Sequence, residues 1–288
     1  MKSNFVSRRK IIKGVALGTL AVSLPSLVWA KNSMVSNSNV SDAEKRGSKY
    51  PAIDDEIVSD VVGKSHFDLE GLKILVDKRP ELSKACWDWR FGDFETAIGA
   101  ASHVGRRDIA EYLISRGARP DLFTWTMLGA FEIVKSTIEL SPGIQKIEGP
   151  HGISLLDHAH AGLRMKDKMT QKNIEDSKKL IAYLESLGDA DGKKYLEVKE
   201  GDKEKYLGDY KYGLGEKEGF TVGLNMRKTI SLGEIGGFGG SLYKISENRF
   251  TYQGAPSVEV MFQIENEEVK SLTLYEPDST LIAKKLSK

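Results

Sequence analysis

The stretch ETAIGAASHVG (Glu95–Gly105) decides the first half of the fold, together with RDIAEYLI (Arg107–Ile114), which follows it. Both stretches carry apolar residues at helical spacing. The small residues of the first stretch let two helices approach closely, and Gly105 permits a left-handed turn between them. The sequence therefore predicts a short helix that turns at this glycine and a second helix that returns alongside it.

The same pattern recurs along the chain. Equivalent positions of the returning helix are spaced by 38, 24 and 47 residues, so the copies are irregular. The equivalent positions are Gly71, Ile109, Ile133 and Leu180. We predict about four helical pairs within residues 51–190, in which each pair covers the apolar face of its neighbour.

These units resemble ankyrin repeats. In that family a T-P-L-H-x-A-A helix turns at a glycine, an L-E-I-V-K-x-L-L helix returns, and Gly-Ala closes the unit. Gly117-Ala118 matches that closing pair, whereas Ala97 and Gly99 replace the family's Pro and His. The resemblance implies a short solenoid that binds a protein or peptide partner through its hairpins and concave helices.

The run CWDWRFGDF lies at the hairpin position before the second unit. Aromatic residues and arginine dominate binding hot spots, so Trp87, Trp89, Arg90 and Phe91 are the candidate binding residues. In the alternative interpretation, the same aromatic side chains cover the degenerate first unit. Cys86, the single cysteine, is expected to be a buried apolar residue.

Beyond Tyr195 the apolar period changes from helical to alternating. Eight short runs, separated by Gly, Asn or charged turns, predict a small antiparallel sheet or partly closed barrel over residues 205–288, after a linker at 191–204. The runs are Tyr206–Tyr212, Phe220–Asn225, Thr229–Leu232, Ser241–Ile245, Arg249–Tyr252, Ser257–Ile264, Val269–Tyr275 and Thr280–Lys285. This region resembles the lipocalin-like β-domain at the C-termini of exported bacterial serine hydrolases and peptidases.

The first thirty residues carry five cations and no acid. The motif SRRKIIK, with its paired Arg8 and Arg9, precedes an apolar run and resembles the twin-arginine export signal. We expect a signal peptide at 1–30, cleavage after Ala30, a flexible tether at 31–50 and no stable membrane insertion after cleavage. An uncleaved signal anchor is the alternative. The whole arrangement resembles exported bacterial ankyrin-repeat proteins and implies a periplasmic location.

Charge balance and cysteine content argue against nucleic-acid binding and against a disulfide-stabilised fold. The chain has 42 basic and 41 acidic residues, and without the five signal cations it has 37 basic residues against 41 acidic ones, a net charge of −4. This balance gives no basis for a nucleic-acid partner. One cysteine excludes a disulfide framework within the chain.

The sequence supplies weak matches to catalytic and metal-binding motifs. Ser241 and Lys244 match S-x-x-K, but a strand places them on opposite faces. His158 and His160, with His151 nearby, form the one local histidine cluster, yet residues two apart on a helix diverge. We therefore expect no catalytic residue, no metal site and no cofactor.

Together these patterns favour a non-enzymatic, periplasmic scaffold whose helical units bind a protein or peptide. The alternative is an exported enzyme, or an enzyme accessory subunit, whose β-domain binds a small molecule. The absence of a nucleophile and base at a suitable spacing favours the scaffold. The oligomeric state is left open.

Overall fold

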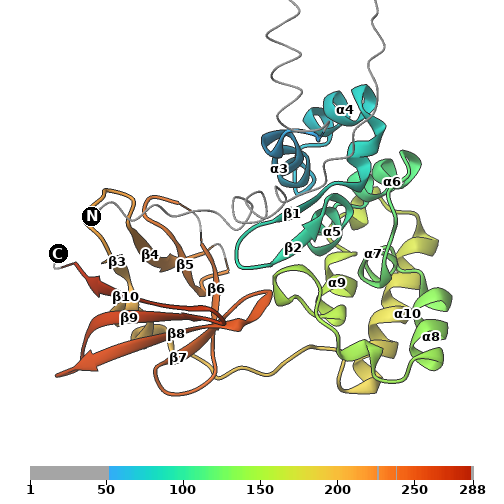
Figure 1. Ribbon diagram of the computed structural model, residues 1–288. Helices are drawn as coiled ribbons and strands as arrows, with labels where there is room; N and C mark the ends of the chain where they lie inside the picture. Colours follow the sequence, from blue (N-terminus) through green and yellow to red (C-terminus); the bar gives the residue numbers. More distant parts are fainter. Residues whose placement is uncertain (1–51, 226, 238, 287–288) are drawn as a thin grey trace, which may run out of the picture. The chain divides into compact units, whose positions relative to one another are not determined.

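The structure of the protein is a computed structural model that describes residues 52–225, 227–237 and 239–286. The chain from Ile53 onward is one unit that contains a helical first part and a β-barrel (Figure 1). The predicted mixed α and β class is therefore confirmed. The signal peptide at 1–30, Arg8, Arg9, the cleavage point and the tether at 31–50 lie outside the described residues. No helix in the described ranges is long and apolar enough to cross a membrane.

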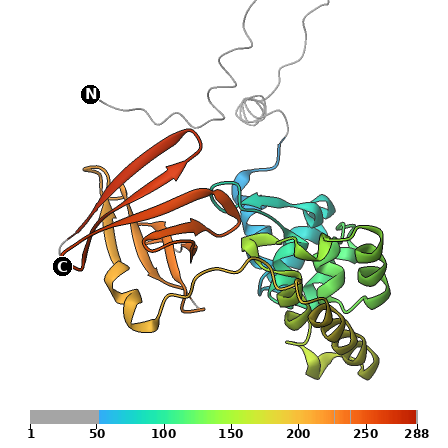
Figure 2. The ribbon, with the colours of Figure 1, turned by 90° about the horizontal axis from the view of Figure 1, so that it is seen from below.

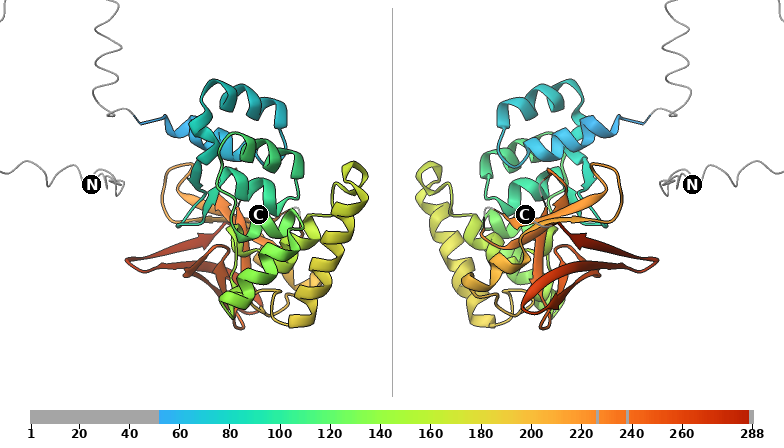
Figure 3. Two further views of the ribbon diagram at one scale, coloured as in Figure 1. Left: turned by 90° about the vertical axis from the view of Figure 1, so that its right-hand side faces the viewer. Right: turned by 90° about the vertical axis from the view of Figure 1, so that its left-hand side faces the viewer.

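The helical part consists of successive helical pairs. Neighbouring helices in sequence contact each other as α3 with α4, α5 with α6, α7 with α8, and α9 with α10. Figure 3 shows the pairs following one another from the blue end of the colour scale to the yellow. The helices are α3 (Asp55–Lys64), α4 (Leu69–Lys78), α5 (Ala97–His103), α6 (Arg107–Ser115), α7 (Leu122–Met127), α8 (Phe131–Leu140), α9 (Leu155–Ala161) and α10 (Gln171–Leu187).

Local chemistry sets the ends of α5, the helix predicted from the opening stretch. The Thr96 hydroxyl accepts a hydrogen bond from the Gly99 amide at 3.0 Å, so the helix begins at Ala97. Gly105 follows the helix with φ of +73°, which confirms the predicted left-handed turn. Because the cap sits at Thr96, Glu95 stays outside the helix and belongs to a strand.

That strand is part of a short hairpin between α4 and α5. Strand β1 (Cys86–Asp88) pairs antiparallel with β2 (Phe94–Thr96), and Trp87 lies opposite Glu95. Alternation along β1 turns Trp87 inward and leaves Cys86 exposed. The expectation that Cys86 is buried is therefore wrong, because this short strand has one face on the surface.

The second part is a closed antiparallel barrel, with the strands in the order β10-β3-β4-β5-β6-β7-β8-β9. All eight predicted strands are present, and pairing of β10 with β3 closes the sheet that we expected to be partly open. Tyr206, Tyr210, Phe250 and Phe262 pack in the barrel core. The strands are β3 (Gly208–Lys211), β4 (Gly219–Leu224), β5 (Ile230–Glu234), β6 (Gly240–Lys244), β7 (Arg249–Tyr252), β8 (Ala255–Glu265), β9 (Glu268–Glu276) and β10 (Ser279–Lys285).

An extended segment and the short helix α11 (Glu200–Lys203) connect α10 to the barrel (Figure 2). Within the predicted linker at 191–204, Leu196 donates its amide to the Lys244 carbonyl at 2.9 Å. The neighbouring Tyr195 ring stacks on Tyr243 with a centroid distance of 4.6 Å. The connecting segment is therefore attached to strand β6 of the barrel. The division into separate domains stays a prediction.

The β1–β2 hairpin makes further contacts with the barrel. At its tip, the Phe91 ring meets the Tyr252 ring edge-on at 5.0 Å, and Arg90 pairs with Glu234 at 3.2 Å. Gly254, in the turn between β7 and β8, has φ of +64° and lies so close that a Cβ there would overlap the Asp93 carboxylate. This close approach fixes the hairpin against the barrel.

We predict that Gly254→Ala lowers the free energy of unfolding by at least about 2 kcal/mol more than Gly236→Ala. Both glycines have positive φ, which costs an alanine about 1–2 kcal/mol, but nothing lies within 4 Å of the Cβ position at Gly236. The difference therefore measures the displacement of Asp93, whose hydrogen bonds would break. Chemical denaturation of both variants provides the comparison. Equal losses would contradict the close contact.

Candidate metal centre

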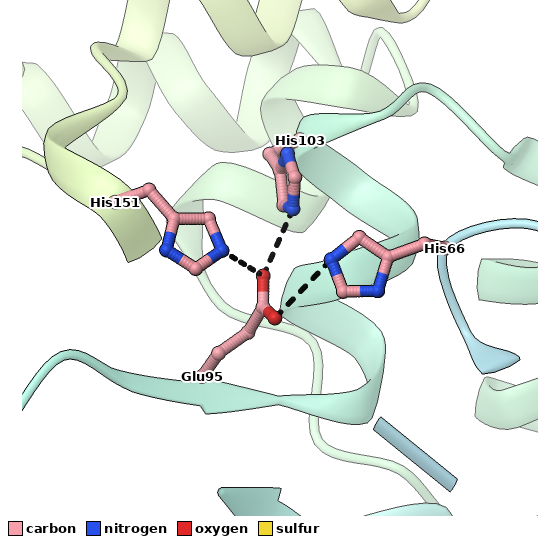
Figure 4. A group of neighbouring side chains, drawn as sticks. All are labelled: His66, Glu95, His103 and His151. Atoms are coloured by element: carbon pink, nitrogen blue, oxygen red, sulfur yellow. Dashed lines mark ion pairs between the residues drawn. The ribbon is translucent and has the colours of Figure 1, made fainter. Parts of the chain in front are cut away.

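Four side chains from four separate segments meet beside the hairpin: His66, Glu95, His103 and His151. One potential ligand atom from each lies within 4.8 Å of all the others (Figure 4). His66 follows α3, Glu95 lies in the middle of β2, and His103 is the last residue of α5. His151 belongs to a short 3-10 turn, η3 (Pro150–Gly152).

The Glu95 carboxylate stands between the three imidazole rings. Its Oε1 lies 2.9 Å from Nε2 of His103 and 3.3 Å from Nε2 of His151, and its Oε2 lies 3.3 Å from Nε2 of His66. The Glu95 side chain has no solvent exposure. The indole N–H of Trp89 donates to Oε2 at 2.6 Å and helps to hold the carboxylate in place.

Several of these buried atoms lack an aligned hydrogen-bond partner. Among the described residues, Oε1 of Glu95 and both ring nitrogens of His103 are buried without one, despite the 2.9 Å separation. Neighbouring ligands of a tetrahedral ion with bonds of about 2.0–2.2 Å are themselves about 3.3–3.6 Å apart. The three carboxylate–imidazole separations of 2.9, 3.3 and 3.3 Å are near that spacing, and all four ligand atoms lie within 4.8 Å of one another. A bound ion would satisfy two of the unpaired atoms, Oε1 of Glu95 and Nε2 of His103.

The outer nitrogens of two rings are held by acceptors. Nδ1 of His66 lies 3.1 Å from the carbonyl oxygens of both Val62 and Gly63, and because carbonyls only accept, it carries the proton. Nδ1 of His151 lies 2.7 Å from Oδ2 of Asp93. Both arrangements direct Nε2 toward Glu95. Metal-ligating histidines are oriented in this way by carbonyl or carboxylate acceptors.

His151 has a strained backbone. Its φ of 61° lies in the left-handed region, where a residue other than glycine costs about 1–3 kcal/mol. Asp93 compensates, because its Oδ1 accepts the His151 backbone N–H at 3.0 Å while Oδ2 contacts the ring. The Asp93 carboxylate therefore fixes both the backbone and the ring of His151.

Burial and neighbouring charge set the protonation of the cluster. Burial opposes ionisation of Glu95, but the contacts with His103, His151 and His66 hold its pKa well below the usual range. Burial lowers the pKa of His103 to about 4, against the opposing effect of Glu95. Burial would also lower the pKa of His151, but Asp93 and Glu95 raise it to about 9. At neutral pH, Glu95 is thus ionised and His103 is neutral, the form that can bind a metal. His151 is protonated and would release a proton when its Nε2 binds the ion.

The structure separates the candidate hairpin residues by their surroundings. Trp87 and Trp89 pack against the core of the helical part, and Trp89 also supports Glu95. Arg90 and Phe91 contact the barrel. Their binding of an outside partner stays a prediction.

The three histidines that lie near one another in the sequence, His151, His158 and His160, do not form one cluster in the structure. His151 joins the centre, whereas His158 is fully buried in α9 with Nδ1 2.8 Å from the Ser154 carbonyl. His160 is half exposed beside Glu185. The candidate centre thus uses one of those three histidines.

Sequence reasoning missed the other members, and we expected no metal site. His66, Glu95, His103 and His151 are separated by 29, 8 and 48 residues, which no local motif spans. One signal was present: Glu95 and His103 bracket an apolar helix of small residues, so burial of that helix carries both inward. Comparison with protein-family models, curated proteins and solved structures gave no match for this chain.

We predict that Trp89→Phe weakens metal binding by about 10–100-fold, as expected for the loss of a contact that supports a ligand. Trp87→Phe is the matched control, since it removes an indole N–H from the same hairpin that makes no hydrogen bond to Glu95 in the described part of the chain. Isothermal titration with Zn²⁺ measures both affinities. An equal effect of the two substitutions would show that the hydrogen bond to Glu95 does not support metal binding.

Proposed function

We propose that this protein binds one divalent first-row transition-metal ion through His66, Glu95, His103 and His151, with Zn²⁺ as the reference case. The observation that carries the proposal is the buried Oε1 of Glu95, which has no aligned donor although two imidazole Nε2 atoms lie within 3.3 Å of it. Imidazole and carboxylate ligands suit zinc, copper, iron and nickel.

A metal-free polar network is the competing interpretation of the same residues. It explains the ionised Glu95 and the protonated His151, which attract each other. However, it leaves Oε1 of Glu95 and both ring nitrogens of His103 without an aligned hydrogen bond, and an unsatisfied buried polar group costs about 1–3 kcal/mol. An ion bound to Oε1 of Glu95 and Nε2 of His103 removes part of that cost, and this favours the metal-binding function.

The proposed site is compatible with the proposed export of the chain to the periplasm. The resemblance of the Arg8-Arg9 motif to the twin-arginine signal implies transport of a folded protein. A site assembled from four distant segments requires a folded chain, so the metal can be bound before transport. We therefore propose a metal-binding protein that acts in the periplasm.

We predict that the chelator-treated full chain takes up one Zn²⁺ per molecule and melts at a higher temperature with the ion. An ion present at 100 times its Kd stabilises the folded state by about 2.7 kcal/mol. Loss of a residue that supports a metal ligand reduces the affinity for the ion by about 10–100-fold. His103→Ala removes a proposed ligand and should reduce the affinity for Zn²⁺ by more than that. Elemental analysis of the dialysed protein and thermal melts with and without Zn²⁺ provide the measurements.

His160→Ala is the matched control for that experiment, because His160 lies on α9 outside the cluster and is half exposed. It should bind Zn²⁺ as tightly as the unchanged chain. Equal loss of the ion in both variants would point to nonspecific binding by surface histidines. A melting temperature that is unaffected by Zn²⁺ in the unchanged chain would overturn the proposal.

A second candidate function is partner binding by the helical pairs, which we propose to be ankyrin-type repeats forming a non-enzymatic scaffold. Large apolar side chains on this part favour it: Phe94 is 65% exposed on the outer face of β2, and Phe67 is 70% exposed. Phe94→Ser should abolish recovery of a stoichiometric partner from periplasmic extract while leaving the metal content unchanged. Recovery that is independent of Phe94 would exclude this surface.

A further inference from the structure

A cavity of about 140 Å³ borders the candidate metal centre. Its wall on the helical side includes two of the four proposed ligands, and its other wall belongs to the barrel. The lining residues are His103, His151, Ile153, Asn225, Arg227, Ser241 and Gln253. The centre is therefore not enclosed by the helical part alone, because residues of the barrel line the other side of the cavity.

The barrel wall presents hydrogen-bond donors and a positive charge. The Arg227 side chain makes no ion pair within the described ranges, and none of the residues that line the cavity is acidic. Gln253 accepts the Ser241 amide N–H through Oε1 at 2.8 Å, which fixes its side chain and leaves the NH₂ group without a partner among the described residues. These groups favour an anion over a cation.

Internal hydrogen bonds hold this wall in place. Oδ1 of Asn225 accepts the backbone N–H of Arg227 at 2.9 Å and that of Thr229 at 3.1 Å. Nδ2 of Asn225 donates to the Ser241 hydroxyl at 2.8 Å. Asn225 thereby ties the backbone of the turn that carries Arg227 to strand β6, so the position of this turn is set before any ligand arrives.

The volume of the cavity suits a small occupant. At about 30 Å³ for each water molecule of the liquid, the cavity holds about four or five waters. A carboxylate such as acetate or a single tetrahedral oxyanion fits this space. The buried His103, whose ring nitrogens lack aligned partners, lines the cavity on the helical side.

We propose that this cavity is the ligand pocket of the metal centre and that it binds a small oxygen anion between the ion and Arg227. The inference rests on the proposed metal binding. Catalytic zinc sites hold the ion by three protein ligands, keep the fourth position for a ligand and sometimes expand to five ligands. An ion held by all four groups would bind the anion by expanding to five ligands. The cavity provides that side next to His103 and His151.

The test uses the full chain loaded with Co²⁺, whose visible absorption responds to a change in its ligands. Titration with acetate and, separately, with inorganic phosphate should shift the bands and saturate. Arg227→Gln should lower the affinity for the tighter-binding of the two anions by about tenfold or more, because a charge-assisted hydrogen bond is lost. Arg249→Gln, which removes the barrel arginine paired with Glu259 away from the cavity, should leave the anion affinity unchanged.

Elemental analysis of the same samples separates the two levels of the proposal. Absence of bound Co²⁺ and Zn²⁺ would overturn the metal centre itself. Normal metal content with no spectral change at millimolar acetate or phosphate would overturn the anion pocket alone, as would an equal affinity in Arg227→Gln and the unchanged chain. A response to acetate alone identifies a planar carboxylate ligand, and a response to phosphate alone identifies a tetrahedral oxyanion.

Discussion

The buried carboxylate of Glu95 is the constraint on which the arrangement of the surrounding elements depends. Removing a carboxylate from water costs several kcal/mol even after relaxation, so it requires compensating charge or hydrogen bonds. Three imidazole rings and the indole N–H of Trp89 provide them. Because these groups come from the end of α3, the β1–β2 hairpin, α5 and η3, one charge fixes four segments relative to one another.

The same hairpin places this charge next to the barrel. Asp93 and Glu95 alternate with the exposed Phe94, so both carboxylates face inward. Asp93 holds His151 through its backbone and ring, and Gly254 of the barrel lies directly against Asp93. The candidate centre and the contact between the helical part and the barrel therefore share Asp93, which contacts both His151 and Gly254.

The sequence predicted the elements because their signals are local. Alternation located all eight barrel strands, and helical spacing located the paired helices, including the turn at Gly105. Whether the helical pairs are ankyrin repeats remains a proposal. The candidate centre escaped prediction because its members lie on four elements and meet only after folding. Cys86 was misplaced for a related reason: the period of a three-residue strand does not reveal which face is covered.

The balance of costs favours a functional over a purely structural role for the cluster. Replacing buried ionic groups with apolar residues of similar volume is often neutral or stabilising, so the stability of the fold alone gives no reason for three histidines around a carboxylate. The strained backbone of His151 and the unpaired atoms of His103 add to the cost. A divalent ion would offset part of these costs, because it would bind Oε1 of Glu95 and Nε2 of His103 and would neutralise the carboxylate. A structural ion is normally enclosed by its ligands and the surrounding protein. Here two of the histidines border a cavity that Arg227 also lines, and the arrangement therefore favours an ion that receives a ligand over one that only supports the fold.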